Sequence, residues 1–199
     1  MSKRESHLTR NTNETSIELQ LNLDGCGGYK IDTGGAGFFN HMLDLLAKHS
    51  GIDLQLKAEG DLHVDDHHLV EDVGIALGTA LTEALGDKAG IERYGSAIVP
   101  MDEVLVLAAV DLSGRFSYFG NYEPQRDRVG DFSTEMVNHF FASLAAASRM
   151  NLHLRVLVEG SNEHHRIEAL FKSFARALKA AVRVNPDSGG AIPSTKGIL

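Results

Sequence analysis

The chain has 199 residues, of which 43% are hydrophobic and 23% charged, and its formal net charge is −8. This length and composition predict a soluble globular protein of one domain or two fused halves. Scattered Lys and Arg residues and the absence of an apolar run of ~18 residues argue against nucleic-acid and membrane partners and favour a small molecule or metal. The single cysteine, Cys26, cannot form an internal disulfide, and no secretion signal precedes Ser6, so we expect a cytoplasmic protein.

The first expected elements alternate with a period of two. Residues 2–13 are polar and are expected to be loose. Residues 14–24 carry apolar side chains on one side and polar ones on the other, which predicts a half-buried strand. A glycine-rich turn leads to a second short strand over residues 29–33. We expect these two strands to form a hairpin.

The next stretch changes to helical spacing. Residues 37–50 are expected to form a helix, and a strand is expected over residues 52–58. The apolar stripe of that helix is predicted to be Phe38, Met42, Leu45 and Leu46. In residues 67–85, apolar positions recur three and four residues apart, which predicts a long helix with Asp65 or Asp66 as its N-cap.

The second half is expected to repeat this alternation of strands and helices. Its middle strand, residues 104–112, is apolar on both faces, which predicts a central position in a sheet. The other expected elements are strands over residues 96–101, 115–120 and 151–158, a loop over 121–131, and helices over 132–149 and 162–184.

Two copies of the pattern His-His-x-x-Glu carry the chemistry of this sequence. They comprise His67, His68 and Glu71, and then His164, His165 and Glu168. On a helix, residues three or four positions apart can approach one face, whereas adjacent histidines point about 100° apart around the axis. One histidine pair therefore suits two neighbouring metal ions better than one. Two pairs indicate a dinuclear centre.

The elements occur in the same order in both halves. Each half has paired strands, a helix with Asn-His, a strand ending in Glu-Gly and a helix opening with His-His-x-x-Glu. The lone histidines, His41 and His139, precede their pairs by 26 and 25 residues. We therefore predict a duplicated α+β unit with a pseudo-twofold axis, repeats of about 10–95 and 96–184, and a tail over 185–199.

The duplication decides how the histidines are interpreted. A single copy of the pattern would favour ordinary core or surface residues, but the two halves together offer eight candidate ligands, or four for each of two metals. Imidazole and carboxylate without thiolate suit Mn²⁺, Fe²⁺ or Zn²⁺, and the carboxylates favour Mn²⁺. The candidates are His41, His67, His68, Glu71, His139, His164, His165 and Glu168. The nearby Asp65, Asp66 and Asp72 are expected to be caps or to orient imidazoles.

Four stretches carry a resemblance to a known family, namely GFFNHMLDLLAKHSGIDL, DDHHLVEDVGIALG, EGSNEHHRIEALFKSFARAL and PSTKGIL. Together they resemble imidazoleglycerol-phosphate dehydratase of histidine biosynthesis, over essentially the whole chain from Arg10 onward. The resemblance implies duplicated α+β halves with helices packed between two mixed β-sheets. It also implies two Mn²⁺ ions per active site and a homo-oligomer of 24 subunits with active sites between subunits.

The resemblance also implies roles for individual residues. The eight metal ligands are the residues named above, and Glu14 is identified as the catalytic carboxylate, in contact with the substrate. The implied contacts to the substrate and its phosphate are Arg93, Arg115, Ser194 and Lys196. His49, two turns after His41, is a further candidate substrate contact, with a plain surface histidine as the alternative.

The sequence departs from the family pattern at a few positions. Asn40 stands where the family usually has Asp, Phe116 stands where it commonly has Pro, and Gly35-Ala36 differs slightly from the usual loop. The Asn40 departure weakens any carboxylate role beside His41. We expect these changes to adjust the properties of the site without changing which residues are assigned to it.

The reaction implied is the dehydration of D-erythro-imidazoleglycerol phosphate to imidazole acetol phosphate. The carbon-bound proton to be lost is not adjacent to a carbonyl, so the expected mechanism stabilises the substrate ring as an imidazolate between two metals. Glu14, which we place outside both repeats, would shuttle the protons. The alternatives are a metal-binding structural shell without turnover and a dinuclear manganese phosphoesterase, for which no Asp-x-Asp ligand set precedes Asp61.

Overall fold

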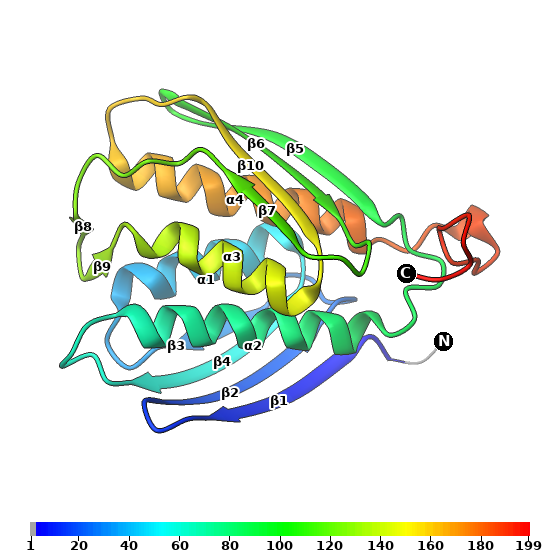
Figure 1. Ribbon diagram of the computed structural model, residues 1–199, viewed down its shortest axis with the longest axis horizontal. Coiled ribbons are helices and arrows are strands. Elements are labelled where there is room, and N and C mark those ends of the chain that lie inside the picture. The colour runs from blue at the N-terminus through cyan, green and yellow to red at the C-terminus, as the bar shows by residue number, and fades with distance from the viewer. Residues whose placement is uncertain (1–2) are drawn as a thin grey trace.

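The computed structural model describes residues 3–199 and contains two four-stranded sheets with helices packed between them (Figure 1). The predicted loose residue Ser2 lies outside the described residues. The elements of the first half are β1 (Glu5–Asn11), β2 (Thr15–Asn22), β3 (Tyr29–Asp32), α1 (Gly37–Ser50), β4 (Asp53–Gly60) and α2 (His67–Leu85). Those of the second are β5 (Tyr94–Met101), β6 (Val104–Asp111), β7 (Ser117–Gly120), β8 (Arg128–Val129), β9 (Phe132–Ser133), α3 (Met136–Ser148), β10 (Asn151–Val158), α4 (Glu163–Val182) and the 3-10 helix η1 (Pro186–Ser188).

The two sheets have the same topology. The first has the order β1-β2-β4-β3, with β3 and β4 parallel and the other pairs antiparallel. The second has the order β5-β6-β10-β7, again with one parallel pair, β10 and β7. The α+β fold with duplicated halves and mixed sheets is therefore confirmed. The exact boundaries of the two repeats stay a prediction.

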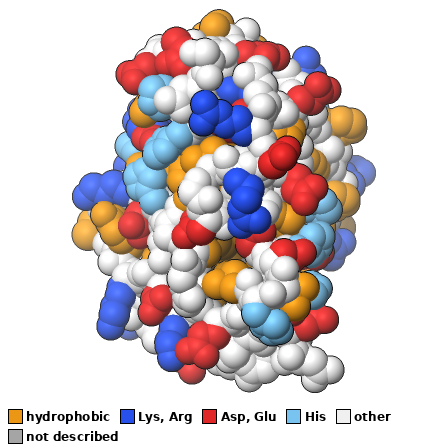
Figure 2. All heavy atoms as spheres, turned by 90° about the vertical axis from the view of Figure 1, so that its left-hand side faces the viewer, with side chains coloured by type: hydrophobic (Ala, Val, Ile, Leu, Met, Phe, Trp, Pro, Cys, Tyr) orange, Lys and Arg blue, Asp and Glu red, His pale blue; other side chains and the backbone are white. Residues whose placement is uncertain are grey.

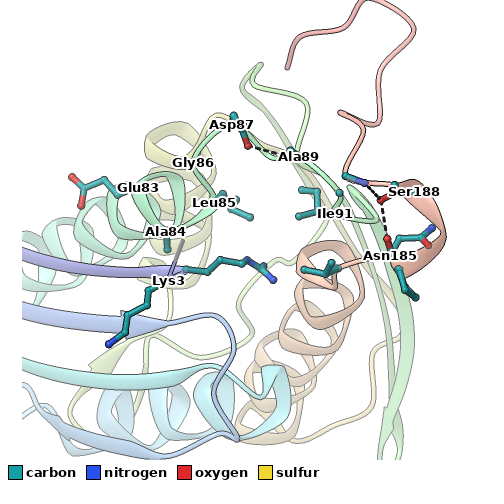
Figure 3. Close-up of a pocket in the computed structure, with 16 residues that line it drawn as sticks. Lys3, Glu83, Ala84, Leu85, Gly86, Asp87, Ala89, Ile91, Asn185 and Ser188 are labelled. Atoms are coloured by element: carbon teal, nitrogen blue, oxygen red, sulfur yellow. Dashed lines mark hydrogen bonds between the residues drawn. The ribbon is translucent and has the colours of Figure 1, made fainter. Parts of the chain in front are cut away.

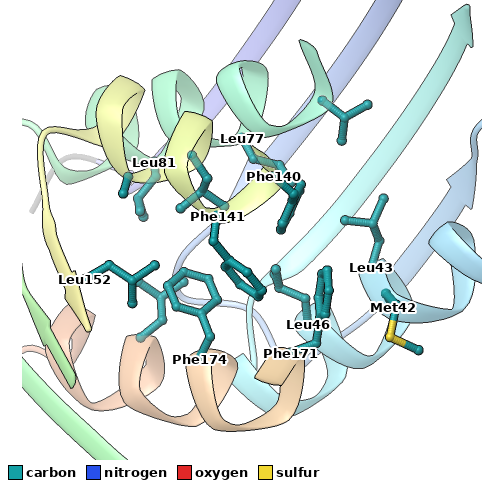
Figure 4. Close-up of a cluster of buried hydrophobic side chains, with 14 of the residues drawn as sticks. Met42, Leu43, Leu46, Leu77, Leu81, Phe140, Phe141, Leu152, Phe171 and Phe174 are labelled. Atoms are coloured by element: carbon teal, nitrogen blue, oxygen red, sulfur yellow. The ribbon is translucent and has the colours of Figure 1, made fainter. Parts of the chain in front are cut away.

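The helices join the halves into one core. α1 packs against α4, and α2 packs against α3, so each contact pairs a helix of one half with a helix of the other. Aromatic side chains fill the centre: the rings of Phe140 and Phe171 stack with centroids 5.1 Å apart, and Phe141 lies against Phe171 with centroids 4.8 Å apart (Figure 4). Each buried side chain of this kind contributes about 1.5–3 kcal/mol relative to exposure.

Three predictions for the first half are wrong. Residues 5–11 are not loose but pair with β2 in antiparallel register, and the sequence hides this because β1 buries only Ser6 fully. β3 forms no hairpin with β2 and instead pairs in parallel with β4 after the α1 crossover. The buried stripe of α1 includes Phe39 and Leu43, whereas Phe38 and Leu45 are only partly buried.

The second half follows the prediction more closely. β6 is an interior strand between β5 and β10, as its apolar run predicts. The predicted helix over residues 132–149 begins only at Met136, because residues 132–133 form β9, which pairs with β8 inside the predicted loop. No helix within residues 3–199 is long and apolar enough to cross a membrane.

Candidate metal centre

The four helices point their N-terminal ends toward one end of the molecule, on the left in Figure 1. His67 and His68 open α2, His164 and His165 lie at the start of α4, and the lone histidines lie early in α1 and α3. Histidine side chains lie in separate groups on the left and right sides of this end (Figure 2). The candidate ligands therefore form two clusters in one chain.

The first cluster, called the α1/α4 cluster, consists of His41, His164 and Glu168. The Nε2 atoms of His41 and His164 lie 3.6 Å and 3.1 Å from Oε2 of Glu168. The candidate ligand atoms of the three residues lie within 4.8 Å of one another, close enough to bind one ion. The lone histidine of the first half therefore meets the His-His-x-x-Glu pattern of the second.

The second cluster, called the α2/α3 cluster, consists of His67, Glu71 and His139. Nε2 of His67 lies 3.3 Å from Oε2 of Glu71, and the ring centroids of His67 and His139 are 5.1 Å apart. It has the same composition as the α1/α4 cluster with the halves exchanged, as the pseudo-twofold axis requires. The structure thus brings six of the eight predicted ligands into two groups of the same composition, of which the α1/α4 cluster has all its candidate ligand atoms within 4.8 Å of one another.

The remaining two candidates, His68 and His165, interact with separate carboxylates. Nδ1 of His68 lies 3.0 Å from Asp61, whose hydrogen bond raises the pKa of His68 above its ordinary value. Nδ1 of His165 lies 3.0 Å from Glu103, and this hydrogen bond is the main cause that lowers the pKa of Glu103 to about 2. Such contacts fix the orientation of an imidazole and raise its basicity as a ligand through Nε2.

Sequence reasoning did not identify Asp61 and Glu103 as the carboxylates that orient His68 and His165. It named Asp72 for such a role, and this prediction is wrong. Asp72, expected to act as a cap or to orient an imidazole, instead accepts a hydrogen bond from Arg10 at 2.6 Å and one from Thr15 at 2.5 Å. This happens because Asp72 lies five residues after His67 and so projects toward β1 and β2 rather than toward the ligands. No helical spacing links Asp61 or Glu103 to the histidines, because both lie on turns.

The aspartates at the start of α2 behave as structural residues. Asp65 accepts a hydrogen bond from the backbone N–H of His67 at 2.9 Å, but the N-cap of α2 is Asp66, whose side chain makes no capping hydrogen bond. Asp66 is buried and accepts 2.6 Å hydrogen bonds from the backbone N–H and the hydroxyl of Ser133. The start of α2 is thereby tied to β9 of the other half.

A second contact from the same region fixes α1. Asp131, between β8 and β9, accepts hydrogen bonds from the backbone N–H groups of Gly37 and Phe38 at 2.5 and 3.0 Å. These donors of the first helical turn have no partner within the helix and carry partial positive charge from the helix dipole, and the N–H of Gly37 also donates to the carbonyl of Gly35 at 3.0 Å. The Phe38 ring also packs edge-on against His164, with centroids 5.1 Å apart. The β8–β9 hairpin therefore helps to position His41 and His164.

Glu14 occupies a repeated position, which contradicts the expectation that it lies outside both repeats. It immediately precedes β2 in the β1–β2 turn, and Glu103 immediately precedes β6 in the β5–β6 turn. Oε2 of Glu14 lies 3.9 Å from Nε2 of His68, and about half of its side chain is exposed. His68 and His165 therefore each lie beside a glutamate at the turn of a hairpin, Glu14 and Glu103 respectively.

The two clusters differ in their charged surroundings. Nζ of Lys172 lies 2.5 Å from Oε1 of Glu168. Burial acts to raise the pKa of Glu168, but Lys172 and the neighbouring histidines outweigh it, so the pKa is lowered and the carboxylate stays ionised. The matching position in α2, four residues after Glu71, is Ile75. Burial and the charges of Lys172 and Arg176 lower the pKa of His49, which lies beside the same charged group.

The predicted phosphate contacts lie far from both clusters. Arg93 donates its backbone N–H to Ala181 near the end of α4, and its guanidinium binds Asp111 at 2.7 Å and the carbonyl of Pro193 at 2.9 Å. Because a helix rises about 1.5 Å per residue, Ala181 lies about 25 Å along α4 from His164.

The other predicted contacts lie toward the same end. Arg115 follows β6 near the end of α3, where its carbonyl accepts a 2.6 Å hydrogen bond from Asn151. Ser194 and Lys196 belong to the tail, which Arg93 holds through Pro193. One chain thus separates its predicted phosphate contacts from its predicted metal ligands.

A pocket of about 740 Å³ opens between the end of α2, residues 86–91 and the tail (Figure 3). Its walls include Leu85 and Ile91, and the hydroxyl of Ser188 is engaged with the carbonyl of Asn185. None of the predicted site residues lines it. The pocket therefore does not belong to the candidate metal centre.

Asn40, where the family usually has Asp, has an unsatisfied side chain within residues 3–199 of the structure. The side-chain oxygen of Asn40 is buried and has no hydrogen-bond partner among the described residues. Its counterpart Asn138 accepts a hydrogen bond from Tyr118 at 2.9 Å and donates one to the carbonyl of Tyr122 at 3.0 Å. Nothing in the structure explains the Phe116 departure.

Comparison with known proteins decides the family. The model of the imidazoleglycerol-phosphate dehydratase family matches residues 34–178. The chain belongs to this family. An imidazoleglycerol-phosphate dehydratase of Rhodopirellula baltica is 54% identical over 100% of this chain and 96% of its own, and that of Listeria innocua is 55% identical over 98% and 100%. The chain is accordingly an enzyme of the hydro-lyase class, and neither the phosphoesterase nor the inert-shell alternative finds support.

Solved structures agree with this membership. The imidazoleglycerol-phosphate dehydratase of Staphylococcus aureus superposes with a TM-score of 0.82 at 38% identity, covering 91% of this chain and 99% of that one. That of Pyrococcus furiosus, in complex with (S)-C348, also gives 0.82, at 35% identity over 96% and 100%. The fold of this dehydratase is therefore the family fold.

Proposed function

We propose that this dehydratase converts D-erythro-imidazoleglycerol phosphate to imidazole acetol phosphate in histidine biosynthesis, at sites that hold two Mn²⁺ ions each. The observation that carries the proposal is the pair of clusters of the same composition, each built from two histidines and a glutamate drawn from both halves. Imidazole and carboxylate donors suit Mn²⁺, and three ligands from one chain leave room for a fourth and for substrate.

The ligand residues of the α1/α4 cluster fit a divalent cation by charge as well as by geometry. Glu168 is kept ionised by Lys172. In both clusters, Nε2 of a histidine lies near a carboxylate oxygen of a glutamate. A cation bound between these two atoms would take the place of the proton that they would otherwise share. Metal ions held there would supply positive charge that stabilises the anionic form of the substrate ring.

Glu14 is proposed to move the protons of the reaction. Its carboxylate stands at the tip of the β1–β2 hairpin, half exposed and 3.9 Å from Nε2 of His68, where it can reach a substrate beside that imidazole. A carboxylate in this position would donate a proton as the hydroxyl leaves and later accept the proton from carbon. Arg115, Ser194 and Lys196 would bind the phosphate, for which guanidinium, hydroxyl and ammonium groups are suited.

The arrangement supports active sites shared between subunits. A substrate with one imidazole ring and a short phosphate arm cannot span the separation of about 25 Å between Arg93 and the α1/α4 cluster. His68 and His165 also point away from the clusters of their own chain, toward separate carboxylates. We propose that neighbouring copies supply the fourth ligands and the phosphate contacts, within the 24-subunit assembly that the family resemblance implies.

A dehydratase assay tests the chemistry. Turnover of imidazoleglycerol phosphate should disappear after EDTA treatment and return when Mn²⁺ is added. Glu14→Gln should lower kcat at least about a hundredfold while two Mn²⁺ per chain remain bound. Glu18→Gln, on the exposed face of β2, is the control and should keep normal turnover. Activity that survives in Glu14→Gln, or that does not respond to metal, contradicts the proposal.

Co-expression of two inactive variants tests the sharing of sites. His164→Ala removes a metal ligand, and Lys196→Ala removes a predicted phosphate contact. If one site combines the metal end of one chain with the tail of another, mixed assemblies regain up to about a quarter of normal activity. Each variant assembled alone stays inactive. Mixed assemblies without any recovered activity contradict shared sites.

A further inference from the structure

Lys88 is a buried lysine in the connection between α2 and β5, with 6% of its surface exposed. Its neighbours Asp87 and Ala89 line the pocket of Figure 3, whereas Lys88 does not. Nζ of Lys88 instead donates a 3.0 Å hydrogen bond to the carbonyl of Leu112, just after the end of β6. Lys88 therefore joins this connection to the turn after β6, residues 112–115, in which Arg115 lies.

The position is unfavourable for a lysine. Burial lowers the pKa of Lys88 below its ordinary value, and the charge of Arg149 acts in the same direction. Asp111, which acts to raise this pKa, is already paired with Arg93 at 2.7 Å. The φ angle of Lys88 is 61°, in the left-handed region that residues other than glycine rarely adopt. An uncharged side chain would avoid the cost of burying an ammonium group, so stability alone does not account for a lysine here.

The connection holds the turn after β6 from two sides. Leu112 is buried, its backbone N–H donates to the carbonyl of Arg93 at 3.1 Å, and its own carbonyl accepts from Lys88. The hydroxyl of Ser113 then accepts a 3.4 Å hydrogen bond from the backbone N–H of Arg115. The place of Arg115 therefore depends on how Leu112 is held.

The tail ends beside the same turn. A Cβ atom at Gly114 would lie 2.8 Å from the carboxyl carbon of Leu199 and 3.8 Å from Nζ of Lys88. The tail that carries Lys196 therefore meets, close to Lys88, the turn that carries Arg115. Both of these residues are phosphate contacts in the proposed function.

The first half contains a matching turn that is held in another way. The strand registers place the turn after β2 at the position of the turn after β6, with Cys26 at the position of Arg115. Asp53 accepts hydrogen bonds from the backbone N–H groups of Cys26 and Gly28 at 2.9 and 2.7 Å. The fold can therefore hold such a turn without a buried lysine. Lys88 stands in the half whose turn carries a predicted phosphate contact.

We propose that Lys88 is a positioning residue for phosphate binding: through the carbonyl of Leu112, its buried ammonium group holds the turn after β6, and with it Arg115, in place for the substrate phosphate. The inference rests on the proposed function, which assigns Arg115 to the phosphate. A hydrogen bond from a charged donor is stronger than one between neutral groups, so its loss should loosen the turn. Lys88 follows the C-terminal end of α2, whereas His67 opens the helix, so Mn²⁺ content should not depend on Lys88.

Steady-state kinetics of the Mn²⁺-loaded enzyme test the proposal with Lys88→Met, which nearly keeps the length of the side chain and removes the ammonium group. KM for imidazoleglycerol phosphate should rise about tenfold while kcat changes less than about twofold, because a phosphate contact shared by the ground and transition states sets KM alone. Lys88→Gln keeps a shorter, neutral donor and should raise KM about threefold. This milder variant carries the test if Lys88→Met does not fold.

The matched control is Asp53→Ala, which removes the anchor of the turn after β2. It should leave KM unchanged even where it lowers the Tm, whereas a purely structural role of Lys88 would make the two variants behave alike. Hydrogen exchange in residues 112–117 should speed up in Lys88→Met and stay unchanged in Asp53→Ala. This second measurement needs no turnover.

A double-mutant cycle shows whether Lys88 acts through Arg115. Arg115→Ala alone should raise KM, and Lys88→Met should then add less than about twofold. A folded Lys88→Met variant with normal KM, an equal rise in KM in Asp53→Ala, or a full tenfold addition to Arg115→Ala overturns the inference and leaves the proposed function in place.

Failure of the proposed function would look different. An Arg115→Ala enzyme with normal KM rejects the phosphate contact, and the role of Lys88 with it. A wild type without dehydratase turnover rejects the proposed reaction, while hydrogen exchange still reports on the turn. Unchanged exchange in Lys88→Met would then overturn the inference as well.

Discussion

His41 and Glu168 belong to opposite halves of the duplicated chain, yet Nε2 of His41 lies 3.6 Å from Oε2 of Glu168. The same exchange joins His139 to His67 in the α2/α3 cluster, with ring centroids 5.1 Å apart. Neither half can form a complete cluster by itself. A metal ion bound at either cluster would therefore hold the two halves together, so binding and folding are coupled.

This coupling predicts a loss of metal-dependent stability when a ligand is removed. Mn²⁺ at about a hundred times its Kd should raise the free energy of unfolding by about 2.7 kcal/mol per occupied site. Glu168→Gln should remove the contribution of the α1/α4 cluster and leave that of the α2/α3 cluster, whereas Glu71→Gln should do the reverse. Thermal denaturation with and without Mn²⁺, together with metal analysis, measures both effects. Equal metal content and equal stabilisation in all three proteins would contradict the assignment.

The second prediction concerns Asp131, which holds the start of α1. Asp131→Ala leaves the N–H of Phe38 without its acceptor and that of Gly37 with only the carbonyl of Gly35, so the free energy of unfolding should fall by about 1 kcal/mol. Because α1 carries His41, the affinity for Mn²⁺ should fall as well. Asp127→Ala, in the loop just before β8, is the matched control. Urea unfolding and metal titration measure the two effects, and a variant with unchanged metal affinity would restrict Asp131 to a structural role.

The third prediction concerns Gly78, where α2 crosses α3. Alanine normally stabilises a helix by about 1 kcal/mol relative to glycine. A Cβ atom at Gly78, however, would overlap the carbonyl oxygen of Leu144 and lie 2.7 Å from Cβ of Ala147. Gly78→Ala should therefore lower the free energy of unfolding by about 2 kcal/mol, because the helices must separate.

The same separation would move His67 away from His139, so Mn²⁺ binding at the α2/α3 cluster should weaken. Thr79→Ala, one position further along α2, is the control and should change the free energy of unfolding by less than about 0.5 kcal/mol. Urea unfolding decides the matter. A stabilised Gly78→Ala variant would mean that the two helices do not approach as closely as described.

Much of this architecture could be predicted because local signals and the duplication agree. The helices that carry His41, His67 and His164 have clear apolar periodicity. The continuous apolar run of β6 predicts its central position in the sheet. β1 could not be predicted, because an edge strand that buries only Ser6 fully has little apolar pattern. The pairing of β3 with β4 depends on a crossover through α1, which strand spacing does not reveal.

The candidate site shows the same division. The ligand types and their number follow from the two His-His-x-x-Glu patterns, but their partition between two clusters depends on how α1 packs against α4 and α2 against α3. Asp61 and Glu103 were missed because they reach their histidines from turns, where no helical or strand period applies. The separation of Arg93 from the clusters is likewise a tertiary property.

The last prediction uses the low pKa of Glu103 in the metal-free protein. The hydrogen bond to His165, together with backbone N–H groups that include those of Ser161 and Asn162, lowers this pKa from its ordinary value of 4.5 to about 2. A carboxylate with a depressed pKa in the folded state adds stability above its unfolded pKa, and this stability is lost as the pH falls toward the folded value. The stabilisation from Glu103 should therefore be complete above pH 4.5 and decline between 4.5 and about 2.

Glu103→Gln should consequently melt at a lower temperature than the wild type at pH 6, and the difference should shrink as the pH is lowered to 3. Glu18→Gln, which removes an exposed carboxylate from β2, controls for the change in net charge. A carbon NMR titration of the Glu103 side chain in the folded protein gives the pKa directly. A titration midpoint near 4.5, or a melting difference that does not change with pH, would mean that His165 is not oriented by this carboxylate. The imidazole would then have no fixed direction from which to offer Nε2 to a metal.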